Sequence, residues 1–150
     1  MAGTMGNALQ ASILSLILNA TPISLIADNT ATTPLTNVYV ALHTADPTNA
    51  GNQTSSEIAY TNYARIAIAR NAGSPAWTVT GTSPASASPN AAITFATSAG
   101  GAGGTVTYVT IGSLVSGTGQ IFWRGAITPS IVVSAGTVPI ISTATTVTLD

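Results

Sequence analysis

The stretch Asn37-Val-Tyr-Val-Ala-Leu-His-Thr-Ala-Asp-Pro47 is the clearest strand in the sequence, and it ends in a turn. Its side chains alternate, so that Val38, Val40 and Leu42 share one face while a more polar set shares the other. Pro47 ends the pairing because proline has no amide hydrogen to donate to a sheet. The chain after this stretch repeats the same pattern of short strand and small-residue turn, which predicts a β-rich protein.

The later strands are predicted from the same alternation. Segments rich in Val, Ile, Thr and aromatic residues are separated by Gly, Ser, Asn and Pro at the spacing typical of sandwich folds. The expected segments are residues 60–70, 76–80, 91–96, 105–111, 120–127, 131–134, 138–141 and 145–149. Residues 82–90, rich in proline and serine, are expected to form a loop because they look too small and polar for a core.

One segment, residues 5–20, has the apolar spacing of a helix. The apolar residues that share its face are Leu9, Ile13, Leu16 and Ile17. Further leucines widen this face, so the helix either plugs the open end of a sandwich or meets another subunit. The predicted fold is mainly β: a single β-sandwich or jelly-roll-like module at residues 36–150, preceded at residues 1–35 by one short N-terminal helix and an extended arm.

The composition limits the possible partners. Charged residues make up 5% of the sequence, with no lysine, against about 25% in typical soluble domains. Three arginines cannot build the basic surface that nucleic acid requires, so a nucleic-acid partner is not expected. No run of about 18 apolar residues is present, so a membrane span is not expected either. A nearly neutral surface suits a protein packed against copies or partners, with a low-charge secreted domain as the alternative.

The sequence contains no constellation typical of an enzyme. His43 lies three residues before Asp46 in a serine-rich chain, but the Gly-x-Ser-x-Gly elbow of a hydrolase is absent. A lone histidine on a strand is more often a hydrogen-bonded structural residue. The carboxylates are scattered and there is no cysteine, so we assign no catalytic residue, no cofactor and no metal site.

The arginines are expected to serve structure and interfaces. With so few anions available, each should pair with a carboxylate or with backbone carbonyls, and Glu57 is the predicted partner of Arg65. Arg124, beside Trp123, is an interface candidate by residue type. The polar loop at residues 48–57 is the best candidate for a partner-binding loop. The predicted interface therefore combines the helix face with Trp123 and Arg124.

Several motifs of the chain, taken as a set, resemble a family of small bacteriophage virion proteins labelled tail-fibre-like or minor structural proteins. Two positions depart from the pattern of that family: Asn62 replaces a glycine that usually precedes Tyr-Ala-Arg, and Tyr108 replaces a frequent histidine. The motifs are Val38-Tyr-Val-Ala-Leu-His-Thr-Ala-Asp-Pro47, Glu57-Ile-Ala-Tyr60, Tyr63-Ala-Arg65, Ile93-Thr-Phe95, Gly104-Thr-Val-Thr107, Ile111-Gly112, Gly125-Ala-Ile-Thr-Pro129 and Val147-Thr-Leu-Asp150.

The resemblance implies a non-enzymatic component of the phage particle. Because the chain has no heptads or repeats from which to build a fibre shaft, we expect a capsid cement or decoration protein on the capsid exterior. Its partners would be the major capsid protein and itself, as a dimer or trimer. Two alternatives remain: a tail or tail-fibre-associated structural protein, and a host-glycan-binding module, which aromatic residues in an exposed groove would favour.

Overall fold

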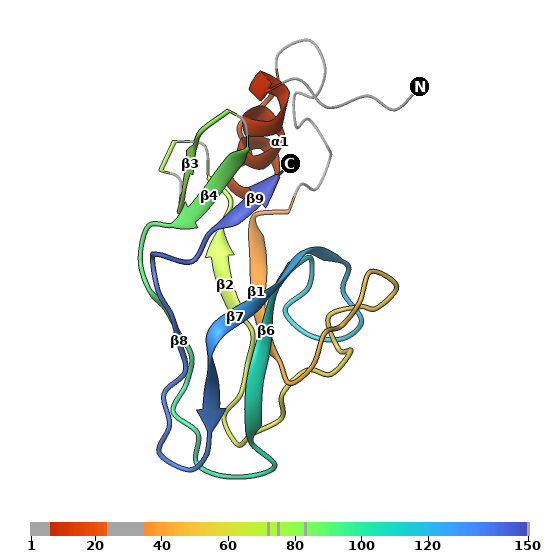
Figure 1. The fold of residues 1–150 in the computed structure, drawn as a ribbon, viewed down its shortest axis with the longest axis vertical. Coiled ribbons are helices and arrows are strands. Elements are labelled where there is room, and N and C mark those ends of the chain that lie inside the picture. The colour runs from red at the N-terminus through yellow and green to blue at the C-terminus, as the bar shows by residue number, and fades with distance from the viewer. Residues whose placement is uncertain (1–6, 24–34, 72, 75, 83, 150) are drawn as a thin grey trace. The chain divides into compact units, whose positions relative to one another are not determined.

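The structure is a computed structural model that describes residues 7–23, 35–71, 73–74, 76–82 and 84–149, with side chains from residue 10 onward (Figure 1). In these residues one helix and nine strands form, and every strand pair with a defined register runs antiparallel. The elements are α1 (Asn7–Asn19), β1 (Asn37–His43), β2 (Ile66–Ala69), β3 (Trp77–Thr80), β4 (Ala85–Pro89), β5 (Ile93–Thr94), β6 (Gly104–Gly112), β7 (Ile121–Val133), β8 (Ile140–Ile141) and β9 (Val147–Leu149). The predicted mainly β class and the short N-terminal helix are confirmed.

The contacts of the chain divide it into two compact units. The helical unit contains Met1–Thr36, Ala69–Ala92 and Ser142–Asp150, and the sheet unit contains Asn37–Ile68 and Ile93–Ile141. The predicted division at residue 35 and the sandwich or jelly-roll topology stay predictions. Most of the predicted arm, residues 24–34, lies outside the described residues.

The sheet unit is built on a four-stranded sheet in the order β2-β1-β6-β7, beside a two-stranded ladder of β5 and β8. The stretch quoted first forms β1, an inner strand in which both faces are buried along its second half. Its register with β6 places Leu42 opposite Val109 and His43 opposite Tyr108. The long strand β7 forms one edge of this sheet and merges the segments predicted at residues 120–127 and 131–134 into one element.

A bulge interrupts the pairing of β6 with β7. Ile111 lies opposite Trp123, whereas the next residue, Gly112, lies opposite Ile121, so Phe122 is the extra residue on β7. A bulge at a sheet edge turns side chains away from the regular alternation. This irregularity falls at the part of β7 that carries Phe122, Trp123 and Arg124.

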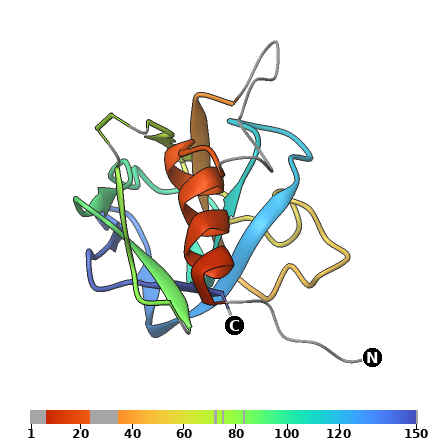
Figure 2. The ribbon, with the colours of Figure 1, turned by 90° about the horizontal axis from the view of Figure 1, so that it is seen from above.

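The helical unit packs α1 against the sheet β3-β4-β9 (Figure 1 and Figure 2). On α1 the fully buried side chains are Leu14 and Leu18, whereas the predicted face at Ile13, Leu16 and Ile17 is only partly buried. The apolar area that the helix buries in its own unit is therefore centred on the leucines that flank the predicted face. Leu9 lies in α1, but its side chain is outside the described part of the chain.

The predicted loop at residues 82–90 is wrong, because β4 is the middle strand of this sheet. Ala85, Ala87 and Pro89 are buried and alternate with the half-buried Ser86 and Ser88. This alternation has the two-residue period of a strand, and all of the side chains in it are small. Small residues are needed here because the helix contacts this strand directly, and a larger side chain would hold the helix away.

Arg70 occupies the carbonyl end of α1. Its Nη2 donates to the Leu16 carbonyl at 2.7 Å, and its Nε donates to the Ile17 carbonyl. These are carbonyls that the helix itself leaves without a partner, and a cation is favourable at this end of the helix dipole. Burial lowers the pKa of Arg70, and its predicted pairing with backbone carbonyls is confirmed.

Candidate functional site

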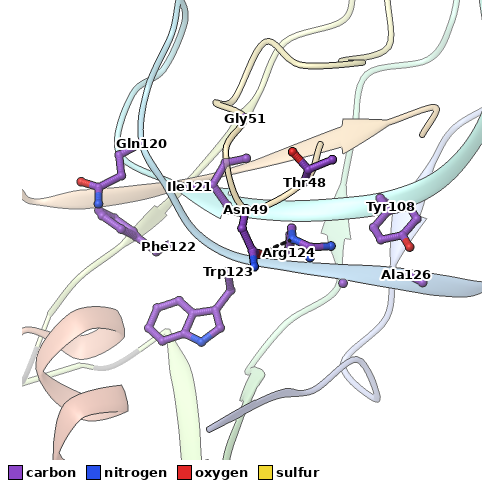
Figure 3. A pocket seen from close by; sticks show the side chains of 11 residues that line it. Thr48, Asn49, Gly51, Tyr108, Gln120, Ile121, Phe122, Trp123, Arg124 and Ala126 are labelled. Atoms are coloured by element: carbon purple, nitrogen blue, oxygen red, sulfur yellow. Dashed lines mark hydrogen bonds between the residues drawn. The ribbon is translucent and has the colours of Figure 1, made fainter. Parts of the chain in front are cut away.

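A groove of about 610 Å³ lies in the sheet unit, between the loop after β1 and strand β7 (Figure 3). Its lining consists of Thr48, Asn49 and Gly51 from the loop, Tyr108 from β6, and residues 120–126 from and just before β7. The groove thus combines the predicted interface residues Trp123 and Arg124 with the beginning of the predicted partner-binding loop, segments that are remote in sequence.

Arg124 holds the two walls of the groove together. Its Nη1 donates to both carboxylate oxygens of Asp46, at 2.6 and 2.7 Å, and its Nε donates to the amide oxygen of Asn49 at 3.0 Å. The side chains are 29% exposed for Arg124 and 36% for Asp46, so this ion pair faces solvent. The charges of Arg124 and Asp46 cancel, so the pair adds no net charge to the groove. Its polar atoms still lie at the surface of the groove.

The loop that forms the opposite wall is tightly folded. Asp46 Oδ1 also accepts a hydrogen bond from the Thr48 amide at 2.8 Å, and Thr48 has a positive φ of 64°. A Cβ at Gly51 would lie 1.9 Å from the Pro47 carbonyl oxygen, so only glycine allows this close backbone approach. The loop therefore presents Thr48 and Asn49 in a fixed geometry.

Aromatic side chains provide the apolar part of the lining. In Figure 3 the Tyr108 and Phe122 rings lie on either side of Arg124, and both residues are half-buried. The indole of Trp123 lies on the other side of β7 from Arg124, as alternation along a strand requires. Both predicted interface residues therefore line the groove, and their side chains extend from opposite sides of β7.

A buried ionic network lies in the same unit. The Arg65 guanidinium forms two hydrogen bonds of 2.7 Å with the Glu57 carboxylate, which confirms the predicted pair. Tyr63 donates its hydroxyl hydrogen to Glu57 Oε1 at 2.9 Å and accepts from the Leu42 amide at 3.1 Å. The bond to Glu57 raises the pKa of Arg65, and burial raises the pKa of Tyr63 far above its ordinary value.

His43 is fully buried, and both of its ring nitrogens are occupied. Nδ1 lies 2.8 Å from the Ser55 carbonyl oxygen, and Nε2 lies 2.8 Å from Thr110 Oγ1. Since a carbonyl only accepts, Nδ1 carries the hydrogen and Nε2 accepts from the threonine. Burial lowers the pKa of His43, which favours this neutral ring. The predicted role as a hydrogen-bonded structural residue is confirmed.

The comparison with protein families shows to which family the chain belongs. The sequence profile described as Podophage GP4 fiber I protein gp80 matches residues 13–149. The chain belongs to this family. A search of curated proteins found no match. The resemblance to small phage virion proteins is therefore confirmed, and the gp80 family places the chain among the structural proteins of the phage particle.

Membership of the gp80 family implies a non-enzymatic role. The described residues contain no cluster of three or more His, Asp or Glu side chains that could hold a metal ion. Within the same residues, no helix is long and apolar enough to cross a membrane. The groove offers hydrogen-bonding groups beside aromatic surface, a combination that is common in ligand sites.

The remaining predicted interface residues of this gp80-family chain belong to the helical unit. Ile13, Leu16 and Ile17 keep part of their surface exposed there, and their role in an interface stays a prediction. Sequence reasoning missed Tyr108 and Phe122 as lining residues. Strand pairing, not spacing along the chain, brings them to the groove.

Proposed function

We propose that this chain is a structural component of the phage fibre apparatus that works through contacts with other virion proteins. The observation that carries the proposal is that each of the three arginines donates hydrogen bonds to groups of the chain itself. Arg65 binds Glu57, Arg124 binds Asp46, and Arg70 binds backbone carbonyls. The fibre description of the matched family supports the same assignment.

Such a surface can be packed against a partner at low cost in desolvation. Burying an unpaired charge is expensive, whereas a neutral surface of Thr, Ser, Ala and Gly loses little when water is removed. In the sheet unit the most exposed large apolar side chains are Val115 and Val132, at 58% and 67%. These residues provide apolar contact points on a surface that is otherwise polar and carries few charges.

The test is location and copy number in purified virions. Immunogold electron microscopy with antibodies against this chain should label the appendages of the particle. Quantitative mass spectrometry should find many fewer copies than of the major capsid protein. Label spread over the whole shell, or hundreds of copies in fixed ratio to the capsid protein, would overturn the fibre assignment.

The second candidate is the capsid cement or decoration role predicted from the sequence, with the chain bound as a dimer or trimer to the major capsid protein on the capsid exterior. The low charge of the sequence favours it, because many copies could lie side by side with little mutual repulsion. A protein that binds only the assembled shell stabilises it by mass action. Shells that lack the chain should then break at lower temperature than complete shells, and equal heat resistance would exclude this role.

A further inference from the structure

We propose that the groove between the loop at residues 48–51 and strand β7 binds a neutral saccharide, with one or two hexose rings as the bound unit. This inference concerns the surface of the folded chain and goes beyond its place in the virion. It rests on the polar groups, the charge balance, the aromatic rings and the rigidity of the groove.

The polar groups are fixed and offer both donors and acceptors. Arg124 Nη1 and Nε are held by Asp46 and Asn49, and none of the described residues accepts a hydrogen bond from Nη2. Because the amide oxygen of Asn49 accepts from Arg124, its NH₂ group is left as a donor. The Thr48 hydroxyl and the Gln120 amide add groups of both kinds to the lining. Sugar hydroxyls, which donate and accept, match such a mixed set.

The charge balance selects a neutral ligand. The Arg124 charge is compensated by both oxygens of Asp46, at 2.6 and 2.7 Å. A phosphate, a sulfate or an acidic sugar would meet the Asp46 carboxylate beside the cation, so the attraction would be largely cancelled. Other cationic side chains are not part of the lining.

The aromatic rings supply the apolar contact that a sugar ring needs. Tyr108 and Phe122 are half-buried, so part of each side chain is accessible beside the polar centre (Figure 3). The face of an aromatic ring carries partial negative charge, which favours the C–H groups on the face of a hexose. A groove of about 610 Å³ is of the size that small-molecule sites have and holds one or two such rings.

The rigidity of the wall reduces the cost of binding. The bonds of Asp46 to the Thr48 amide and to Arg124 fix the loop before a ligand arrives, and at Gly51 the backbone approaches Pro47 closely. The positive φ of Thr48 is a strained conformation for a β-branched residue, and such strain is common where a loop presents side chains to a ligand.

The experiment is saturation-transfer-difference NMR of the whole chain with glucose, galactose, mannose, rhamnose and N-acetylglucosamine, and with their oligosaccharides. At least one neutral sugar should show transfer, and both Tyr108→Ala and Asn49→Ala should weaken its affinity tenfold or more. Val132→Ala, a change at an exposed residue outside the groove, is the matched control and should leave affinity unchanged. Circular dichroism establishes that each variant is folded.

A further variant tests the charge argument. Asp46→Asn keeps a hydrogen-bond acceptor for the Thr48 amide but leaves Arg124 uncompensated, so binding of glucuronate should strengthen relative to glucose. The proposal is overturned if no neutral sugar binds, if binding survives the groove variants, or if a phosphate or a peptide of a virion protein occupies the groove instead. None of these results depends on where the chain lies in the particle, so the fibre assignment is tested separately.

Discussion

The guanidinium of Arg65 meets the carboxylate of Glu57 through two parallel hydrogen bonds, Nε to Oε1 and Nη2 to Oε2, each 2.7 Å long. The same guanidinium donates to the Leu114 carbonyl at 2.9 Å and to the Gly117 carbonyl at 2.8 Å. One cation therefore joins the segment before β2 to the turn between β6 and β7. The Arg65 side chain is 2% exposed, so its donors have few alternatives in water.

Removing the anion of this pair should destabilise the fold strongly. Glu57→Gln leaves a buried guanidinium without its counter-charge, and we expect a loss of about 3 kcal/mol in the free energy of unfolding. Urea unfolding at pH 7 measures it. The matched control is Asp46→Asn, which breaks the exposed pair with Arg124 and should cost less than about 1 kcal/mol. Equal losses in the two variants would contradict a structural role for the buried pair.

Two glycines of the sheet unit form a second matched pair. A Cβ at Gly112 would lie 2.3 Å from Gln53 Cδ and 2.5 Å from the Gln120 carbonyl oxygen, whereas a Cβ at Gly125 would meet nothing within 4 Å. Gly112→Ala should therefore lower stability by about 1–3 kcal/mol, as overpacking does. Gly125→Ala should be nearly neutral. Thermal unfolding of both variants measures the difference. Similar melting temperatures would show that Gln53 and the backbone at Gln120 can move away from the added methyl group.

The small side chains of β4 should be required for the packing of the helix. Ala87 is 1% exposed, and Ala87→Leu adds volume where α1 contacts this strand, which should cost about 1–3 kcal/mol. Ser88→Thr, at the half-buried neighbouring position, should change stability by less than about 0.5 kcal/mol. Chemical unfolding followed by circular dichroism measures both. If Ala87→Leu left the free energy of unfolding unchanged, α1 would not be packed tightly against β4.

Stability should fall as the pH drops below about 6.5, because His43 is buried as the neutral ring. Burial lowers its pKa in the folded state, although the Ser55 carbonyl and nearby Glu57 oppose this effect and Arg65 adds to it. The unfolded chain then binds more protons than the folded one below pH 6.5. The stabilisation is present above the unfolded pKa and is lost as pH falls toward the folded pKa, by at most about 1.4 kcal/mol per pH unit.

The measurement is the free energy of unfolding between pH 7.5 and 5. His43 is the one histidine of the sequence, so His43→Gln should flatten the slope between pH 6.5 and 5 even if it lowers stability at every pH. An unchanged slope in this variant would assign the pH dependence to other groups.

The sequence predicted those features that depend on neighbours along the chain. Alternation identified β1 and β6, because a strand with buried side chains on one face must repeat every two residues. The pair Arg65–Glu57 was predicted because the chain offers few anions to its three arginines. The helix was recognised from its apolar spacing, although the structure buries the flanking Leu14 and Leu18 most deeply.

Only the tertiary structure decided the features that depend on distant segments. The Ala-Ser alternation of β4 has the period of a strand, but its small side chains gain their packing from α1, which precedes them by more than sixty residues. Asp46 and Arg124 are 78 residues apart, and the pairing β1-β6-β7 brings them together. Local conformational preferences act over a few residues. Which residues meet in a groove or a core depends on which strands pair, and strand pairing is determined by the fold as a whole.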